Sequence, residues 1–343
     1  MPASASFRIN RALRGARPEI AKRASDQSPT LFEIPVEYTL VSMFSGCGGM
    51  DLGFVGDFEA LGRKYERLPF RIVWANDNNP AACRTYCHNL HQHILCGDVW
   101  QYLNTLPERA DVLIGGFPCQ DVSINGNRNG LNGKRTSLYR AMVEGVRRIN
   151  PKVFVAENVK GLLMKDTEEI LHLILKEFGD LGYNVSWQLY LAANYGVPQM
   201  RERIFIVGTS KRRRVRPFVH PSPRLTEDQW VTTKAAIGDL EDAPECWETS
   251  HIWSRANRSP EQGNRIVKAH RPADTIRAEC HGNIQFHYSK PRRLSMREAA
   301  RIQTFPESFR FLSKLRETER QVGNAVPPVL AWHIARAVRD SLS

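Results

Sequence analysis

The chain has 343 residues, of which 42% are hydrophobic and 24% are charged, so it can bury a sizeable core and is not a disordered chain. No apolar run approaches the roughly 18 residues of a membrane span, and the first residues lack the apolar segment of a secretory signal. We therefore expect a cytoplasmic protein without a membrane partner. The formal net charge of +12 predicts a polyanionic partner, most often nucleic acid, with a merely solvated basic face as the alternative.

Seven cysteines with no CxxC pair indicate reduced thiols rather than a disulfide framework. Cys83 and Cys87 lie one helical turn apart, with Cys96 and several histidines nearby, so a metal site is one interpretation. Their spacing fits no familiar zinc pattern, and small thiols are common where a helix packs on a sheet. We therefore predict that the chain binds no metal.

The amino-terminal part of the chain predicts a ligand-binding turn. Residues 1–37 are rich in arginine without an apolar period, which indicates a basic, mostly disordered arm. A strand pattern over 38–44 leads into a glycine turn at 45–49 and then into an amphipathic helix pattern over 50–65. Strand, glycine turn and helix together present backbone N–H groups to a ligand.

Two acidic residues follow the next two predicted strands. The strand over 70–76 ends at Asp77, whose carboxylate suits the two hydroxyls of a ribose; a loop acid or helix N-cap is the alternative. A helix is predicted over 80–90. After a short strand at 94–96 comes Asp98, which could accept a hydrogen bond from the amino group of a purine.

A thiol and a carboxylate follow two further strands. An apolar run over 111–114 stops at two glycines, which places Cys119 in the loop at the strand's carboxyl end, where open α/β sheets bind ligands. An inert core cysteine is the alternative. A helix over 137–150 leads to the strand over 152–156, which ends at Glu157. Parallel strands would bring Cys119 and Glu157 to one site.

The next elements introduce two arginines. Helix and strand patterns cover 167–181 and 184–191, and a further strand pattern begins at Gln199. Alternation along that strand predicts that Gln199, Arg201 and Arg203 share one face, which suits an anion or a base carbonyl. A surface strip of ion pairs is the alternative.

The carboxyl-terminal third is basic and irregular before it becomes helical. From Ser210 to Arg293 there are 16 Lys and Arg residues against 10 Asp and Glu, a net charge of +6. Tryptophans and other aromatic residues lie among these charges, which indicates a small recognition lobe rather than a linker. Helix patterns return at 295–303 and 325–342.

Several of these stretches, in their order along the chain, resemble the motifs of the cytosine-C5 DNA methyltransferases, especially the compact bacterial restriction-modification type. The resemblance covers nearly everything from Tyr38 onward except about 210–270, and the ordered set is highly specific. The matching stretches are FSGCGG (44–49), GDV (97–99), GGFPCQDVS (115–123), ENV (157–159), QMRER (199–203), RLSMREAARIQTFPESF (293–309) and QVGNAVPP (321–328).

This resemblance implies a doubly wound α/β, S-adenosylmethionine-dependent methyltransferase fold with a mixed seven-stranded sheet and a small inserted target-recognition domain. The implied divisions are a basic arm at 1–37, a catalytic and cofactor-binding domain at 38–209, a target-recognition domain at 210–291, and a returning segment at 292–343. The last helix would then pack beside the glycine turn.

The resemblance also implies the catalytic and cofactor-binding residues. Cys119 would be the nucleophile, Glu157 the acid at the cytosine ring, and Arg203 the group that holds the base carbonyl. The cofactor is S-adenosyl-L-methionine. Asn78 stands where many members have an aromatic residue against adenine. The residues implied for the cofactor site are Phe44, Ser45, Gly46, Cys47, Gly48, Gly49, Asp77, Asn78, Asp98, Val99, Pro118, Leu138, Asn324 and Ala325.

The implied substrate is cytosine in double-stranded DNA, which a flap at 120–135 would enclose after the base has flipped out. Thr275-Ile276 resembles the pair that anchors the recognition lobe to DNA, and a pair of core strand residues is the alternative interpretation. The residues implied for DNA binding are Gln120, Ser123, Asn125, Arg135, Arg201, Thr275 and Ile276. We expect a monomeric, DNA-associated bacterial enzyme, and leave open a cognate restriction endonuclease that acts on the same site without direct contact.

Two rival functions remain open at this point. A nicotinamide-dependent oxidoreductase would also need a glycine turn and Asp77, but it leaves Glu157, Arg203 and the basic lobe unexplained. A DNA-binding protein that keeps only the methylase scaffold would not need Cys119, Glu157 and Arg203. The DNA sequence recognised is not predictable, because the segment that would read the bases matches no motif.

Overall fold

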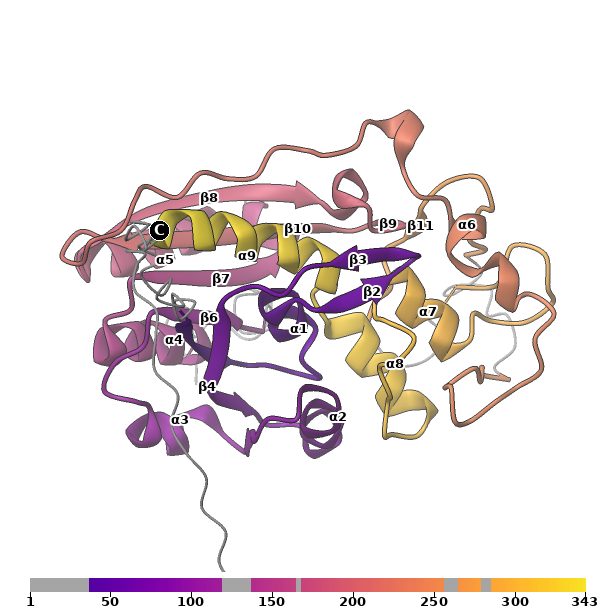
Figure 1. The fold of residues 1–343 in the computed structure, drawn as a ribbon, viewed down its shortest axis with the longest axis horizontal. Helices are drawn as coiled ribbons and strands as arrows, with labels where there is room; N and C mark the ends of the chain where they lie inside the picture. Colours follow the sequence, from indigo (N-terminus) through magenta and orange to yellow (C-terminus); the bar gives the residue numbers. More distant parts are fainter. Residues whose placement is uncertain (1–36, 119–136, 165–167, 256–264, 279–284) are drawn as a thin grey trace, which may run out of the picture. The chain divides into compact units, whose positions relative to one another are not determined.

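A mixed seven-stranded sheet lies at the centre of the computed structural model, which describes residues 37–118, 137–164, 168–255, 265–278 and 285–343 (Figure 1). The strand order is β5-β4-β1-β6-β7-β10-β8. The strands are β1 Tyr38–Met43, β4 Phe70–Asp77, β5 Leu95–Cys96, β6 Val112–Gly116, β7 Val153–Val159, β8 Tyr183–Leu191 and β10 Glu202–Ser210.

The order of the strands confirms the predicted doubly wound α/β fold. The chain starts in the middle of the sheet at β1, moves outward through β4 to β5, and then returns to β6 on the other side of β1. Strands β5, β4, β1, β6 and β7 are parallel, whereas β10 pairs antiparallel with both β7 and β8. The winding reverses between β1 and β6, where doubly wound sheets bind ligands beyond the carboxyl ends of their strands.

Helices cover both faces of the sheet because alternate strand residues are apolar on both sides (Figure 1). Leu40 and Ile114 point into the core under one set of helices, and Val41 and Leu113 into the core under the other. The first set is α1 Gly49–Val55, α2 Pro80–Leu90 and α9 Pro328–Leu342, and the second is α3 Val99–Tyr102, α4 Ser137–Ile149 and α5 Glu168–Asp180.

Helices α1 and α9 approach each other closely at Gly53. A Cβ atom on Gly53 would lie 2.4 Å from Ala331 Cβ and 2.6 Å from the Pro328 carbonyl oxygen. Only a residue without a side chain permits this contact, which fixes the last helix beside the first. The predicted return of the carboxyl-terminal helix beside the glycine turn is thus confirmed.

Two helix predictions were wrong at their boundaries. The helix predicted over 50–65 ends at Val55, because Gly56 takes a positive φ of 70° and reverses the chain into a hairpin. The hairpin strands are β2 Phe58–Ala60 and β3 Arg63–Tyr65. The helix predicted from residue 325 begins at Pro328. Helix α8, Leu315–Asn324, was not predicted, because charged residues separate its few apolar ones.

The described part of the segment between β10 and α7 has little regular structure, as the fading periodicity predicted. It contains α6 Thr233–Ile237 and a two-residue strand, β11 Ala273–Asp274, which pairs in parallel with β9 Gln199–Met200. Helix α7, Met296–Ile302, starts where predicted, because the Ser295 side chain caps it. Within the described ranges, no helix has both the length and the apolar character needed to cross a membrane.

We expect Gly53→Ala to lower the free energy of unfolding by about 1–3 kcal/mol, because the added methyl group would overlap α9. Gly179→Ala is the matched control, since Gly179 is also helical and a Cβ atom there meets nothing within 4 Å. That variant should be neutral or gain up to about 1 kcal/mol. Urea unfolding measures both, and equal losses would contradict the proposed tightness of the α1–α9 contact.

Candidate active site

The carboxyl ends of β6 and β7 place Glu157 beside the chain that leads to Cys119. Gly116 pairs with Glu157 in the parallel register, and Asn158 Nδ2 donates to the Phe117 carbonyl at 3.1 Å. A Cβ atom on Gly116 would lie 2.9 Å from Glu157 Oε2, so a side chain there would press on the carboxylate. The expected parallel pairing of the two strands is confirmed, while Cys119 itself lies outside the described residues.

Glu157 is held by Arg203 in a nearly buried ion pair. Arg203 Nε lies 3.0 Å from Glu157 Oε1, and the two side chains are 12% and 10% exposed. Burial raises the pKa of Glu157 above its ordinary value, because desolvation outweighs the opposing charges of Arg203 and Arg201. The site therefore contains a carboxyl that binds a proton more readily than a solvated glutamate does.

Asp77 joins the glycine turn to the end of β4. One carboxylate oxygen accepts the Gly46 N–H at 2.8 Å, and the other accepts the Asn79 N–H at 2.9 Å. Phe44 and Gly46 both have a φ of 56°, which turns the chain sharply after β1. No atom lies within 4 Å of the position of a Cβ on Gly46, so the turn has open space beside it.

The backbone of Asp77 connects this turn to Asp98. The Gly97 N–H donates to the Asp77 carbonyl at 2.9 Å, and Asp98 follows directly. One oxygen of the exposed Asp98 carboxylate accepts the Trp100 N–H at 3.1 Å and so caps α3, which begins at the buried Val99. The two acidic residues predicted after neighbouring strands therefore lie at one edge of the sheet.

The segment after α8 reaches the same turn from the far end of the sequence. A Cβ atom on Gly49 would lie 2.5 Å from the Val326 carbonyl oxygen and 3.1 Å from Ala325 Cβ. Asn324 is exposed at the end of α8, and Cys47 Sγ contacts the Gln321 carbonyl at 3.8 Å. The glycine turn and the 324–325 segment, both predicted for the cofactor, are thus neighbours.

The other residues predicted for the cofactor are placed less closely. Phe44 and Leu138 are half-buried and pack on the same apolar core, beneath α3, α4 and α5. Asn78 is exposed directly after β4. Pro118 is also exposed, and it is the last described residue before Cys119. Ser45 and Gly48 complete the turn, since the Gly48 N–H donates to the Ser45 carbonyl at 2.9 Å.

The strand that was predicted to carry Gln199, Arg201 and Arg203 on one face is interrupted at Arg201. Arg201 lies between β9 and β10. Its side chain is buried, and its guanidinium donates to the backbone carbonyls of Ile276, Gly323 and Ala325 at 2.9–3.0 Å. A DNA contact by Arg201 would require the guanidinium to leave these carbonyls.

Thr275 and Ile276 belong to the same buried neighbourhood. Thr275 Oγ1 donates to the Met200 carbonyl at 2.7 Å, and Ile276 has no exposed surface. The remaining residues predicted for catalysis or DNA binding lie outside the described ranges, and they are Cys119, Gln120, Ser123, Asn125 and Arg135.

No role was predicted for Asn158, although its side chain bonds β7 to the chain before Cys119. An amide directly after an acidic residue at the end of a buried strand was the available signal. Among the described residues, no group of three or more His, Cys, Asp and Glu side chains could hold a metal ion.

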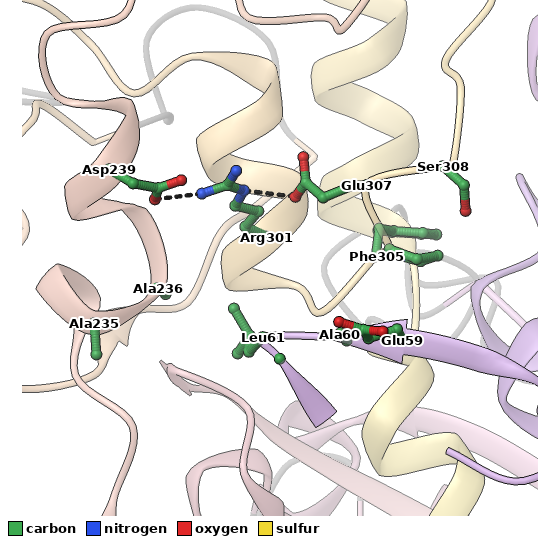
Figure 2. Close-up of a pocket in the computed structure, with 12 residues that line it drawn as sticks. Glu59, Ala60, Leu61, Ala235, Ala236, Asp239, Arg301, Phe305, Glu307 and Ser308 are labelled. Carbon is green, nitrogen blue, oxygen red and sulfur yellow. Dashed lines mark hydrogen bonds and ion pairs between the residues drawn. The ribbon is translucent and has the colours of Figure 1, made fainter. Parts of the chain in front are cut away.

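A cavity of about 480 Å³ is lined by a different set of residues (Figure 2). Leu61 at the tip of the β2–β3 hairpin, Ala236 and Phe305 line it, and Arg301 bridges Asp239 and Glu307 across one side at 2.5 Å each. None of the residues predicted for the cofactor or for catalysis lines this cavity, so it is separate from the candidate active site.

Comparison with known proteins defines the class. The sequence profile of the C-5 cytosine-specific DNA methylase family matches residues 38–268 and 245–340. The type II methyltransferase M.NgoFVII of Neisseria gonorrhoeae is 35% identical over 334 residues, which cover 87% of this chain and 86% of that protein. M.FnuDI of Fusobacterium nucleatum is 34% identical over 339 residues, covering 89% and 95%.

Solved structures support the fold. A crystal structure of a putative DNA modification methyltransferase encoded within an E. coli prophage has a TM-score of 0.68 at 21% identity, covering 89% of this chain and 99% of that one. The Dnmt2 methyltransferase of S. pombe has a TM-score of 0.64 at 18% identity, with the same coverages. This chain belongs to the C-5 cytosine-specific DNA methylase family.

Members of this family use S-adenosyl-L-methionine, and this chain is a DNA cytosine methyltransferase that takes the same cofactor. The residues around the glycine turn fit this cofactor. Asp77 keeps acceptor capacity beyond its two backbone bonds, Asp98 is exposed beside it, and the turn at Gly46 has open space. A ribose and an adenine amino group are matched by these acceptors.

The raised pKa of Glu157 predicts a pH-dependent contribution to stability. A carboxyl whose pKa is raised on folding stabilises the folded state fully below its unfolded value of about 4.3, and this contribution is lost as the pH rises through the raised value. Glu157→Gln removes the titration. The free energy of unfolding of the wild type minus that of Glu157→Gln should therefore fall as the pH rises above about 4.

Urea unfolding of both proteins at several pH values measures this difference. Glu144→Gln is the control with the opposite sign, because hydrogen bonds from Arg147 and Arg148 lower the pKa of Glu144 to about 2. Its contribution is present above the unfolded value and is lost as the pH falls, so its difference should not decline over the same range. A flat Glu157 series would contradict the raised pKa.

Proposed function

We propose that this enzyme transfers a methyl group from S-adenosyl-L-methionine to carbon 5 of a cytosine that is flipped out of a specific short duplex sequence. The observation that carries the proposal is the buried Glu157–Arg203 pair at the sheet edge, beside the segment that leads to Cys119. A flipped cytosine presents N3, an exocyclic amine and O2 together, and a protonated carboxyl next to a guanidinium complements that edge.

Carbon 5 of cytosine is a weak nucleophile, so the ring needs activation before it can be methylated. We assign this step to Cys119, whose thiolate adds to carbon 6 and forms a covalent bond with the base. Electron density then moves towards N3, where Glu157 supplies a proton and the Arg203 guanidinium supports O2. The bound cofactor supplies the methyl electrophile. Loss of the carbon 5 proton to water then expels the Cys119 thiolate by elimination, and the proton at N3 returns to Glu157 as the methylated base is released.

The basic segment supports the DNA part of the proposal. Flipping a base costs a few kcal/mol, which contacts elsewhere on the duplex must offset. We propose that residues 210–291 form the target-recognition domain, that 38–209 and 292–343 form the catalytic part, and that the arm at 1–37 adds charge. The +6 of the 210–293 segment is suited to phosphate contacts.

The names of the two bacterial relatives suggest the biological role of the enzyme. Both are type II methyltransferases, so we infer that this enzyme is the protective methylase of a restriction-modification system. It would act in the bacterial cytoplasm as a monomer on the DNA site that a cognate endonuclease cleaves. No contact between the two enzymes is required for this role.

The test is methyl transfer from labelled S-adenosyl-L-methionine to mixed-sequence duplex DNA, followed by mapping of the marked cytosines. Label at carbon 5 of cytosine within one short motif is the expected result, because one recognition lobe reads one site. DNA binding without transfer would instead favour a DNA-binding protein that keeps the methylase scaffold without its activity.

Cys119→Ser should abolish turnover while leaving cofactor binding nearly unchanged, because a serine hydroxyl is rarely ionised at neutral pH and so cannot replace the thiolate. Turnover and calorimetric titration with S-adenosyl-L-homocysteine measure the two effects. Cys87→Ser, at an exposed thiol of α2, is the control that should retain activity. Substantial turnover by Cys119→Ser would remove Cys119 from the nucleophile's role.

A further inference from the structure

Two buried glutamines join segments that the proposed function assigns to DNA and to the cofactor. Gln199 lies in β9 and Gln303 ends α7, and neither side chain has exposed surface. Gln199 Nε2 donates to Gln303 Oε1 at 2.8 Å. A direct bond between two buried amides is costly to disturb, because a lost partner leaves a polar group unsatisfied.

Backbone groups at both ends of the pair fix the orientation of the amides. Gln303 Nε2 donates to the carbonyls of Val322 and Ala325 at 2.6 and 3.1 Å, so its nitrogen must face them. Its oxygen therefore accepts from Gln199, whose own oxygen accepts the Ile276 N–H at 2.9 Å. The result is one directed chain of hydrogen bonds from Ile276 to Ala325.

Arg201 joins the same two segments a second time. Its Nη1 donates to the Ile276 carbonyl at 2.9 Å, and its Nη2 donates to the carbonyls of Gly323 and Ala325 at 3.0 Å each. The planar guanidinium holds these carbonyls in a fixed arrangement, which a flexible ammonium group would not do.

The two backbones also touch directly. A Cβ atom on Gly323 would lie 2.5 Å from both the Ala278 nitrogen and the Arg277 carbonyl carbon. A displacement of residues 275–278 therefore cannot leave 322–325 in place, because contact and hydrogen bonds oppose it together. Strands β9 and β11 lie side by side at this junction (Figure 1).

We propose that the Gln199–Gln303 pair, together with Arg201, couples DNA binding at Thr275-Ile276 to cofactor binding at Asn324-Ala325. The inference rests on the proposed function, which assigns these two segments to their ligands. The three side chains are positioning residues, since they act through backbone groups. Coupling is reciprocal, so DNA tightens cofactor binding by the same factor by which the cofactor tightens DNA binding.

The experiment is titration of the full chain with S-adenosyl-L-homocysteine, without DNA and with a saturating duplex that the wild type methylates, or mixed-sequence duplex if it methylates none. The ratio of the two dissociation constants is the readout. For the wild type we expect a ratio within the usual range for coupled sites, roughly fivefold to 150-fold. Gln303→Met should lower it by at least about twofold, because it removes one link and leaves the Arg201 bonds in place.

Gln188→Met is the matched control, because Gln188 is half-buried in the edge strand β8 and belongs to neither the proposed DNA-binding nor the proposed cofactor-binding residues. It should keep the wild-type ratio. If Gln303→Met does not fold, Gln199→Glu tests the same bond, since it preserves shape but replaces the donor to Gln303 by an oxygen. Binding of one S-adenosyl-L-homocysteine per chain shows that a variant is folded.

The outcomes separate the coupling from the activity. A wild-type ratio near unity, or an unchanged ratio in the folded glutamine variants, overturns the coupling even if the wild type methylates DNA. A large wild-type ratio that falls in the variants, without methyl transfer by the wild type, supports the coupling and overturns the proposed activity. A purely structural role would lower thermal stability and leave the ratio unchanged.

Discussion

The ion pair between Glu157 and Arg203 is the interaction on which the candidate active site depends. A carboxylate in the interior is costly unless it has a cationic partner, and in this structure the partner comes from β10. Because β10 runs antiparallel to β7, its first residues lie at the edge where β7 ends, with Arg203 paired opposite Val159. A parallel strand in that place would begin at the opposite edge. The antiparallel direction of β10 therefore supplies Arg203 as the partner of Glu157. Burial nevertheless raises the pKa of Glu157.

Asp77 organises the other half of the site in a similar way. Its carboxylate fixes the glycine turn through Gly46, and its backbone carbonyl accepts the Gly97 N–H, so one residue sets the positions of two segments predicted for the cofactor. Burial raises the pKa of Asp77, while the backbone N–H groups of Asn79 and Gly46 oppose this effect. The wound sheet brings these groups together at the carboxyl ends of β1, β4 and β5.

Local sequence patterns predicted those helices and strands that are determined by residues close together in the sequence. The strand that ends at Asp77 and the strand that carries Glu157 were predicted because each contains an apolar run that leads into a polar residue, and α2 matched its predicted bounds. The burial of Arg201 was not predictable in this way, since its carbonyl partners are 75 to 124 residues away. The resemblance to a family supplied roles for Cys119 and the cofactor residues that spacing alone left open.

The segment 199–203 shows why the irregular break at Arg201 matters. In a continuous strand, Gln199, Arg201 and Arg203 would all point to one side. With the break, Gln199 and Arg201 both bond to the backbone of Ile276, whereas Arg203 reaches Glu157. Burial lowers the pKa of Arg201, and the positive charge of Arg203 lowers it further. Substitutions within this segment should therefore combine non-additively, because neighbouring side chains that share partners are not independent.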